Sequence, residues 1–134
     1  MPRTNSDRAR LFWMFCLPAR GGLIVAAYAV AHWDAEPAQL AFAALALVAA
    51  TGLLVNWYQY KQVGGLGGDA WWHPVRPAHA LVYIVYASLV FGGVAKAWIV
   101  LIADVALAIL FWAALSPTLN QTPFEVMLGP CCNR

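Results

Sequence analysis

The chain has 134 residues, of which 63% are hydrophobic and 10% charged, with a formal net charge of +2 and a mean hydropathy of +0.66. Soluble domains carry roughly 25% charged residues, so this composition excludes an ordinary water-soluble protein. The small net charge also argues against a nucleic-acid-binding protein. The length is that of a single domain, and the composition indicates an integral membrane protein.

The first apolar run extends over residues 11–33 and is interrupted at Pro18 and Arg20. Three arginines precede it, as in a signal peptide, but Arg20 breaks the apolar region that such a peptide needs. We therefore expect a retained first span over residues 11–33. The proline predicts either a kink near Pro18 or a short interfacial helix over residues 11–17 that precedes the span.

An acidic turn containing Asp34 and Glu36 separates this run from a second span, predicted over residues 38–60. That span ends in an aromatic belt of Trp57, Tyr58 and Tyr60, as expected where a helix leaves the hydrocarbon. The longest loop follows, over residues 61–76. Its GGLGG stretch lacks the Lys-Ser/Thr of a phosphate-binding loop and is interpreted as a flexible hinge.

The third and fourth spans are predicted over residues 77–94 and 97–115. Pro77 suits the first turn of a helix, and Gly92, Gly93 and Lys96 indicate a tight turn between the two spans. Residues 116–134 form a mixed tail after Ser116-Pro117. The fold class predicted from these elements is all-α, an integral membrane bundle of four transmembrane helices.

The orientation follows from the distribution of cations. With four spans, the cations Arg3, Arg8, Arg10, Arg20, Lys61, Arg76 and Arg134 fall toward one side, and Lys96 alone falls on the other. Because cytosolic loops are enriched in Lys and Arg, the positive-inside rule predicts that both termini are cytosolic, N-in and C-in. The Gly-rich loop is then cytosolic as well.

Polar residues inside the apolar runs are the candidates for function. Asp104 is about 12 Å below the outer turn, which places Tyr86–Ser88 opposite it in the hairpin, and Arg20 is about 20 Å down, level with Tyr83. A buried charge is expected to have a partner. We therefore predict an intramembrane polar cluster of Arg20, Tyr83, Tyr86 and Asp104. It is interpreted either as a small ion or proton path, or as a structural ion pair. A third alternative is that Arg20 only snorkels to the headgroups.

A second group of polar residues marks the inner interface. Arg76, His79, Tyr83 and Tyr86 fall on one helical face, at i, i+3, i+7 and i+10. Together with Trp71 and Trp72, Arg76 and His79 are predicted to form either an interfacial anchor or a site for an anionic lipid headgroup. In the second case, the histidine is one that changes charge near neutral pH.

No cofactor or metal is expected from the remaining motifs. His32 falls at the outer end of the first span, whereas His73 and His79 fall at the inner mouth, about 30 Å away, too far for bis-histidine haem ligation. The three cysteines, Cys16, Cys131 and Cys132, form no metal-binding or disulfide pattern. Cys131 and Cys132 are candidates for palmitoylation, with unmodified thiols as the alternative.

The stretches GGLGGDAWWHPVRPAHALVYIVYA and KAWIVLIADVALAIL resemble an uncharacterised family of multi-pass membrane proteins of giant DNA viruses of algae and protists. The Cys16-Leu-Pro-Ala-Arg20 stretch is similar to a Pro-x-Arg early in those proteins. The second span here is richer in alanine than theirs. The resemblance implies a membrane topology and a virion or host endomembrane, and it brings no activity, cofactor or substrate.

These patterns favour a non-enzymatic structural or assembly membrane protein, in contact with the lipid bilayer and either forming homo-oligomers or binding other membrane proteins. A small ion or proton channel or transporter component that uses Arg20, Tyr83 and Asp104 is the alternative. A lipid-modifying enzyme that uses Arg76 and His79 is a third and weaker hypothesis, because no nucleophile–base set or carboxylate pair accompanies these residues.

Overall fold

The computed structural model describes residues 12–33, 35–59 and 73–115. This part of the chain consists of helices and turns, which confirms the all-α prediction. Its elements in chain order are a π-helical segment η1 (Phe12–Cys16), α2 (Leu17–His32), α3 (Glu36–Tyr58), a 3₁₀ turn η2 (His73–Val75), α4 (Arg76–Phe91) and α5 (Ile99–Leu115).

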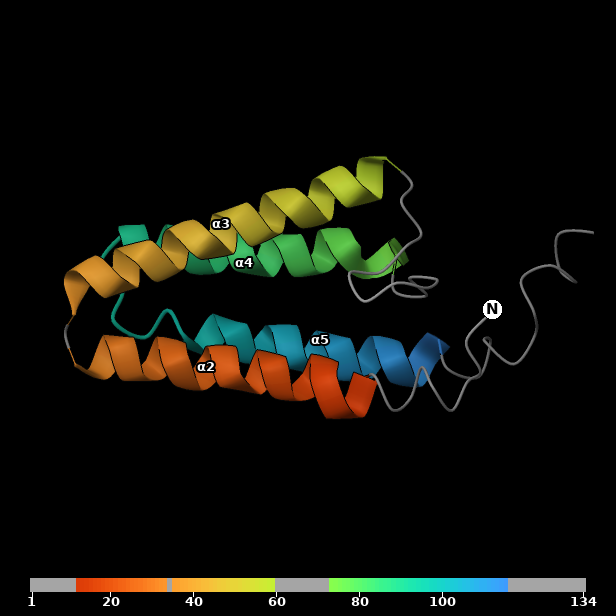
Figure 1. The fold of residues 1–134 in the computed structure, drawn as a ribbon, viewed down its shortest axis with the longest axis horizontal. Helices are drawn as coiled ribbons and strands as arrows, with labels where there is room; N and C mark the ends of the chain where they lie inside the picture. The colour runs from red at the N-terminus through yellow and green to blue at the C-terminus, as the bar shows by residue number, and fades with distance from the viewer. Residues whose placement is uncertain (1–11, 34, 60–72, 116–134) are drawn as a thin grey trace, which may run out of the picture.

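The four long helices lie side by side as an antiparallel bundle (Figure 1). In this view α3 and α4 form one layer, and α2 and α5 form the other. The α3–α4 pair has the most extensive packing of all described pairs, and the two layers are joined mainly through α4–α5 and α2–α3. The predicted four-helix bundle is therefore present.

The sequence explains where these helices begin. Pro18, Pro37 and Pro77 each lie in the first two positions of α2, α3 and α4, where a missing backbone N–H removes no helical hydrogen bond. Before Pro18 the chain winds as the wider π-helix, because a proline crowds the carbonyl four residues earlier. The predicted first span is thus one continuous helical run from Phe12 to His32. The predicted irregularity near Pro18 is the change from π-helix to α-helix within it.

Helix α4 ends three residues earlier than its predicted span, and the reason is local. Gly93 adopts a left-handed conformation with φ of +73°. Its N–H donates to the Val90 carbonyl over 2.9 Å, and the Val94 N–H donates to the Leu89 carbonyl over 2.9 Å. These two bonds form a Schellman motif, which closes the helix and satisfies its last carbonyls.

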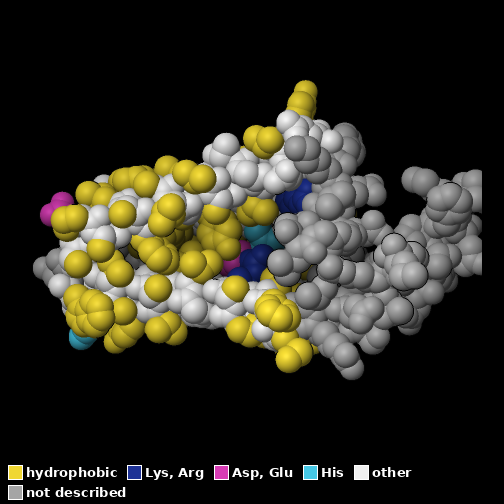
Figure 2. Space-filling view, in the orientation of Figure 1, with side chains coloured by type: hydrophobic (Ala, Val, Ile, Leu, Met, Phe, Trp, Pro, Cys, Tyr) yellow, Lys and Arg dark blue, Asp and Glu magenta, His cyan; other side chains and the backbone are white. Residues whose placement is uncertain are grey.

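Small side chains line the interior of the bundle. Ala43 and Ala50 on α3, and Ala80 and Ala87 on α4, are at most 1% exposed. Each pair is seven residues apart and so lies on one helical face, which lets the two backbones approach closely. Large apolar side chains instead face outward over much of the described surface (Figure 2). Small residues inside and large apolar residues outside are typical of a bundle that packs in lipid.

In the described part of the chain, three helical segments are long and apolar enough to cross a membrane: Phe12–His32, Glu36–Tyr58 and His73–Phe91. Helix α5 is equally apolar but has only 17 residues, which span about 26 Å against a hydrocarbon thickness of about 30 Å. Backbone bonds from Ala97, Ile99 and Val100 to carbonyls three residues earlier make a tighter turn that leads into it. The predicted fourth span began at residue 97. This turn explains why α5 begins two residues later, at Ile99.

Candidate polar site within the bundle

The carboxylate of Asp104 is the centre of a polar cluster inside the bundle. Arg20 Nη1 donates a hydrogen bond to its Oδ2 and forms an ion pair with it. Tyr83 OH donates to the same oxygen over 3.1 Å, and His79 Nδ1 lies 2.5 Å from Oδ1. Arg20 Nη1 is also 3.1 Å from His79 Nδ1. Both carboxylate oxygens therefore have partners.

Three helices supply these four residues. Arg20 comes from the first turn of α2, Asp104 from α5, and His79 and Tyr83 from α4. The spacing of His79 and Tyr83 is i, i+4, which places both side chains on one face of α4. Cys16, four residues before Arg20, accepts a hydrogen bond from Arg20 Nε at 3.5 Å. The cluster therefore ties α2 and α4 to α5.

The cluster is almost sealed from its surroundings. The side chains of Asp104 and His79 are 3% exposed and that of Arg20 is 14% exposed. Asp104 is also the largest fully buried side chain of the described residues. Figure 2 shows acidic, basic and histidine side chains together in a hollow between the two layers. Because an isolated charge in hydrocarbon costs at least about 2.5 kcal/mol, the pairing of Asp104 with Arg20 is a condition for burying either.

The register of the α4–α5 hairpin differs from the sequence prediction. Asp104 faces His79 and Tyr83, whereas depth counting predicted Tyr86–Ser88 opposite it. Figure 1 shows the cause: the segment between the helices runs back along the bundle, so that α5 begins further from the end than the point where α4 stops. Residues of α5 consequently lie deeper than a tight turn would place them.

Tyr86, predicted as a cluster member, lies elsewhere. It is 3% exposed and belongs to an apolar core with Ala27, Ala97 and Leu101. Its ring makes an edge-to-face contact with Phe42 of α3, with 6.4 Å between centroids. The structure thus brings Arg20, Tyr83 and Asp104 together, adds His79, and leaves Tyr86 in the apolar layer on the other side.

The two described residues of the predicted inner anchor, Arg76 and His79, have different partners in the structure. Arg76 is 2% exposed, and its Nη1 donates to the Asn56 carbonyl of α3 over 3.0 Å. Arg76 therefore joins the start of α4 to α3. The side chain of His79, one helical turn further along α4, contacts Asp104 instead. Trp71, Trp72, Cys131 and Cys132 lie outside the described residues.

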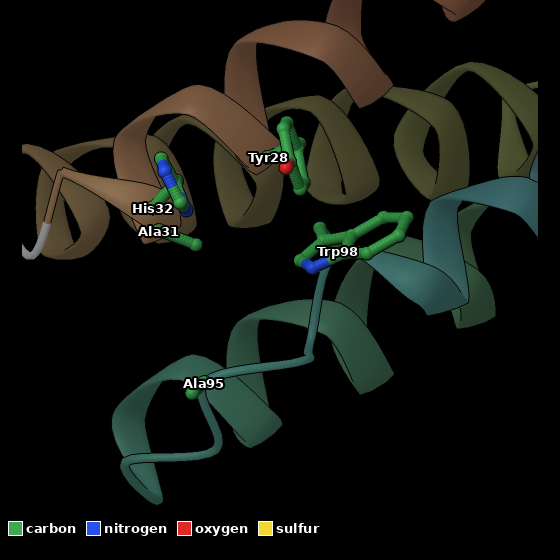
Figure 3. A pocket seen from close by; sticks show the side chains of 5 residues that line it. All are labelled: Tyr28, Ala31, His32, Ala95 and Trp98. Atoms are coloured by element: carbon green, nitrogen blue, oxygen red, sulfur yellow. The ribbon is translucent and has the colours of Figure 1, made fainter.

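A second hollow lies at the opposite end of the bundle, where α2 ends (Figure 3). It has a volume of about 150 Å³ and is lined by Tyr28, Ala31 and His32 of α2 and by Ala95 and Trp98 of the segment before α5. The rings of Tyr28 and His32 are stacked at 5.7 Å, and Trp98 meets Tyr28 at 5.2 Å. These rings form an aromatic end to the bundle, as is common at a membrane–water boundary.

Within residues 12–33, 35–59 and 73–115, no three of the His, Cys, Asp and Glu side chains are placed to hold a metal ion. His32 lines the hollow at one end, whereas His79 contacts Asp104 nearer the other. The chemistry that the polar cluster can offer is therefore hydrogen bonding, charge pairing and proton exchange.

Sequence reasoning missed His79 as a partner of Asp104. The signal was the shared α4 face of His79 and Tyr83, which the i, i+4 spacing already indicated.

Comparisons of the chain with family models, with curated proteins and with solved structures give no match.

Proposed function

We propose that this protein is a non-enzymatic structural or assembly component of a membrane, held in one helical arrangement by the Arg20–Asp104 cluster. The observation that carries the proposal is the saturation of one carboxylate by donors from two other helices. A buried charge whose partners are all in place fixes which helices pack and at which register. An open conduit instead needs polar groups that continue through the bundle.

The surroundings of the cluster support the same role. Beyond Tyr83 toward the opposite end of the bundle, the interior consists of Ala27, Tyr86, Ala97 and Leu101. This layer is buried and mainly apolar, so it separates the cluster from the aromatic end. A sealed ion pair beneath an apolar layer is suited to hold helices together.

The exterior supports a role in assembly. Leu45, Val48, Leu81 and Leu110 are each at least 60% exposed and offer an apolar surface to acyl chains or to other membrane proteins. Gly21 and Gly22 of α2 have open space where a side chain would stand. Such positions permit close contact with another helix, as the proposed homo-oligomer or other membrane partner needs.

The proposed location is a virion or host endomembrane, and it depends on the resemblance of residues 64–87 and 96–110 to giant-virus membrane proteins. Immunogold labelling of infected cells and purified virions tests it. Label on virions or internal membranes is the expected result, and label confined to other membranes would remove this part of the proposal.

A double-mutant cycle tests the structural role. Arg20→Met and Asp104→Leu each leave an unpaired charge in the bundle, and each is expected to lower the free energy of unfolding by about 3–5 kcal/mol. The double variant removes both charges and is expected to recover most of that loss. Thermal unfolding in detergent and insertion into membranes are the measurements. A double variant as unstable as the sum of the singles would contradict a packing role.

A conduit for protons or small ions is the second candidate, favoured by the direct contact of His79 with Asp104. It is tested by ion and proton flux into liposomes that carry the wild-type protein or Asp104→Asn. Flux that the substitution abolishes would replace the structural proposal with a channel or transporter. Wild-type protein that is folded but gives no flux would retain the structural proposal.

A further inference from the structure

The hollow at the end of α2 is lined by side chains whose polar atoms are not used inside the bundle. Tyr28 contacts His32 and Trp98 through its ring. Within residues 12–33, 35–59 and 73–115, the Tyr28 hydroxyl, the ring nitrogens of His32 and Trp98 Nε1 form no hydrogen bond. An indole N–H can only donate. The hollow therefore offers hydrogen-bond donors to a group that comes from outside the bundle.

The hollow exists because the segment before α5 runs back along the bundle (Figure 1). This path places Ala95 and Trp98 across from Ala31 and His32 of α2 (Figure 3). The two alanines leave open the space that larger side chains would fill, and the volume is about 150 Å³. A cavity of roughly this volume holds a molecule such as benzene. A phosphate group is no larger than benzene and fits the same space.

Two exposed charges of opposite sign lie beside the hollow. Lys96 follows Ala95 directly and is exposed. Glu36, the first residue of α3, is exposed as well. The N–H of Ala35 donates to the Val30 carbonyl over 3.4 Å, and this bond holds the start of α3 next to the last turn of α2. A ligand that meets both charges carries an anionic group and a cationic group.

We propose that the hollow binds the headgroup of a zwitterionic phospholipid, with its phosphate toward Trp98 and Lys96 and its ammonium toward Glu36. Ionised phosphate oxygens only accept hydrogen bonds, so they match an indole N–H and a lysine ammonium. A short linker joins the phosphate to the ammonium in such lipids, so one headgroup meets both charges. This inference goes beyond the structural role, which needs no bound lipid.

The surface next to the hollow favours a lipid over a water-soluble ligand. Val25 precedes Tyr28 by three residues on α2, and Ile102 follows Trp98 by four on the α5 side, so each continues one face of its helix. Val25 is 66% exposed and Ile102 is 46% exposed. Acyl chains that extend from a headgroup in the hollow would lie on this apolar surface. Tryptophan and tyrosine are also enriched at the level of the headgroups.

Solution NMR of the full chain, labelled with nitrogen-15 in its tryptophans and held in maltoside micelles, tests the proposal. Trp98→Phe and Trp57→Phe assign two indole N–H signals by their loss. Trp57 lies near the last residue of α3, at the other end of the bundle, and is the matched control. Dihexanoylphosphatidylcholine is expected to shift the Trp98 signal saturably and to leave the Trp57 signal unchanged. Equal shifts of both signals would mean general partitioning and would overturn the proposal.

A second lipid and two charge variants test the arrangement of the headgroup. Dihexanoylphosphatidylglycerol has the phosphate without the ammonium and is expected to bind about two- to fivefold more weakly, as for the loss of one exposed ion pair. Glu36→Gln is expected to remove this preference, and Lys96→Gln to weaken both lipids by a similar factor. Tighter binding of phosphatidylglycerol, or phosphatidylcholine binding that neither variant changes, would contradict the proposal.

Glycerophosphocholine separates a lipid from a soluble ligand, because it has the same headgroup without acyl chains. It is expected to bind at least about tenfold more weakly than the lipid, since it buries no apolar chain. Equal affinity would overturn the assignment to a lipid. Lys96 and Glu36 lie outside the polar cluster, and the structural role is measured by unfolding of Arg20 and Asp104 variants. Failure of the headgroup site is therefore distinct from failure of the structural role.

Discussion

Asp104 and Arg20 compensate each other inside the bundle, and the hydroxyl of Tyr83 adds a third partner at the same oxygen. The contribution of each residue depends on what its removal leaves behind. Loss of a charged partner leaves an unpaired charge, whereas loss of the Tyr83 hydroxyl leaves a carboxylate that still has Arg20 and His79. The tyrosine is therefore expected to be the least costly member of the cluster to change.

Two tyrosines of α4 make a matched test of this ranking. Tyr83→Phe is expected to lower the free energy of unfolding by about 1.5–3 kcal/mol, because one hydrogen bond to a buried carboxylate is lost. Tyr86→Phe, three residues further along in the apolar core, is expected to change it by less than about 0.5 kcal/mol. Thermal unfolding of both variants in the same detergent is the measurement. Equal losses would mean that Tyr86 also takes part in the polar cluster.

At the scale of elements, the α4–α5 connection decides which residues meet. The Schellman motif at Gly93 ends α4 abruptly, and the following residues carry the chain back along the bundle before α5 begins (Figure 1). This path sets the level of Asp104 relative to His79 and Tyr83. The polar cluster therefore depends on a turn that lies well away from it along both helices.

Gly93→Ala tests that dependence. A side chain at φ of +73° is strained, and the substitution is expected to cost about 1–2 kcal/mol of unfolding free energy. Gly52→Ala is the matched control, because Gly52 lies within α3 with open space around it, and alanine there should be neutral or stabilising. Unfolding of the two variants is compared with the wild type. If Gly93→Ala leaves the free energy of unfolding unchanged, the turn does not constrain the hairpin.

For the molecule as a whole, sequence periodicity and composition predicted the helices, while their relative register required the structure. Long apolar runs bounded by Pro18, Pro37 and Pro77 place α2, α3 and α4 within a few residues of their observed limits. Arg20, Tyr83 and Asp104 were grouped because an intramembrane charge needs a partner. His79 was assigned to the interface and Tyr86 to the cluster, because depth counting cannot include a connection that doubles back along the helices.

The orientation of the whole bundle is open to a direct test, because the chain has two lysines, Lys61 and Lys96, on opposite sides of α4 in the sequence. The positive-inside distribution predicts Lys61 in the cytosol and Lys96 outside. An amine reagent that does not cross membranes should therefore modify Lys96 in intact cells and reach Lys61 only after lysis. Lys61→Arg and Lys96→Arg identify each site without changing the charge.

Each alternative pattern of labelling has a distinct meaning. Modification of Lys61 alone from outside would reverse the predicted orientation of the bundle. Equal modification of both lysines from outside would mean that α4 does not cross the membrane. In that case Asp104 would not lie in hydrocarbon, and its burial would no longer require the charge of Arg20 as a partner.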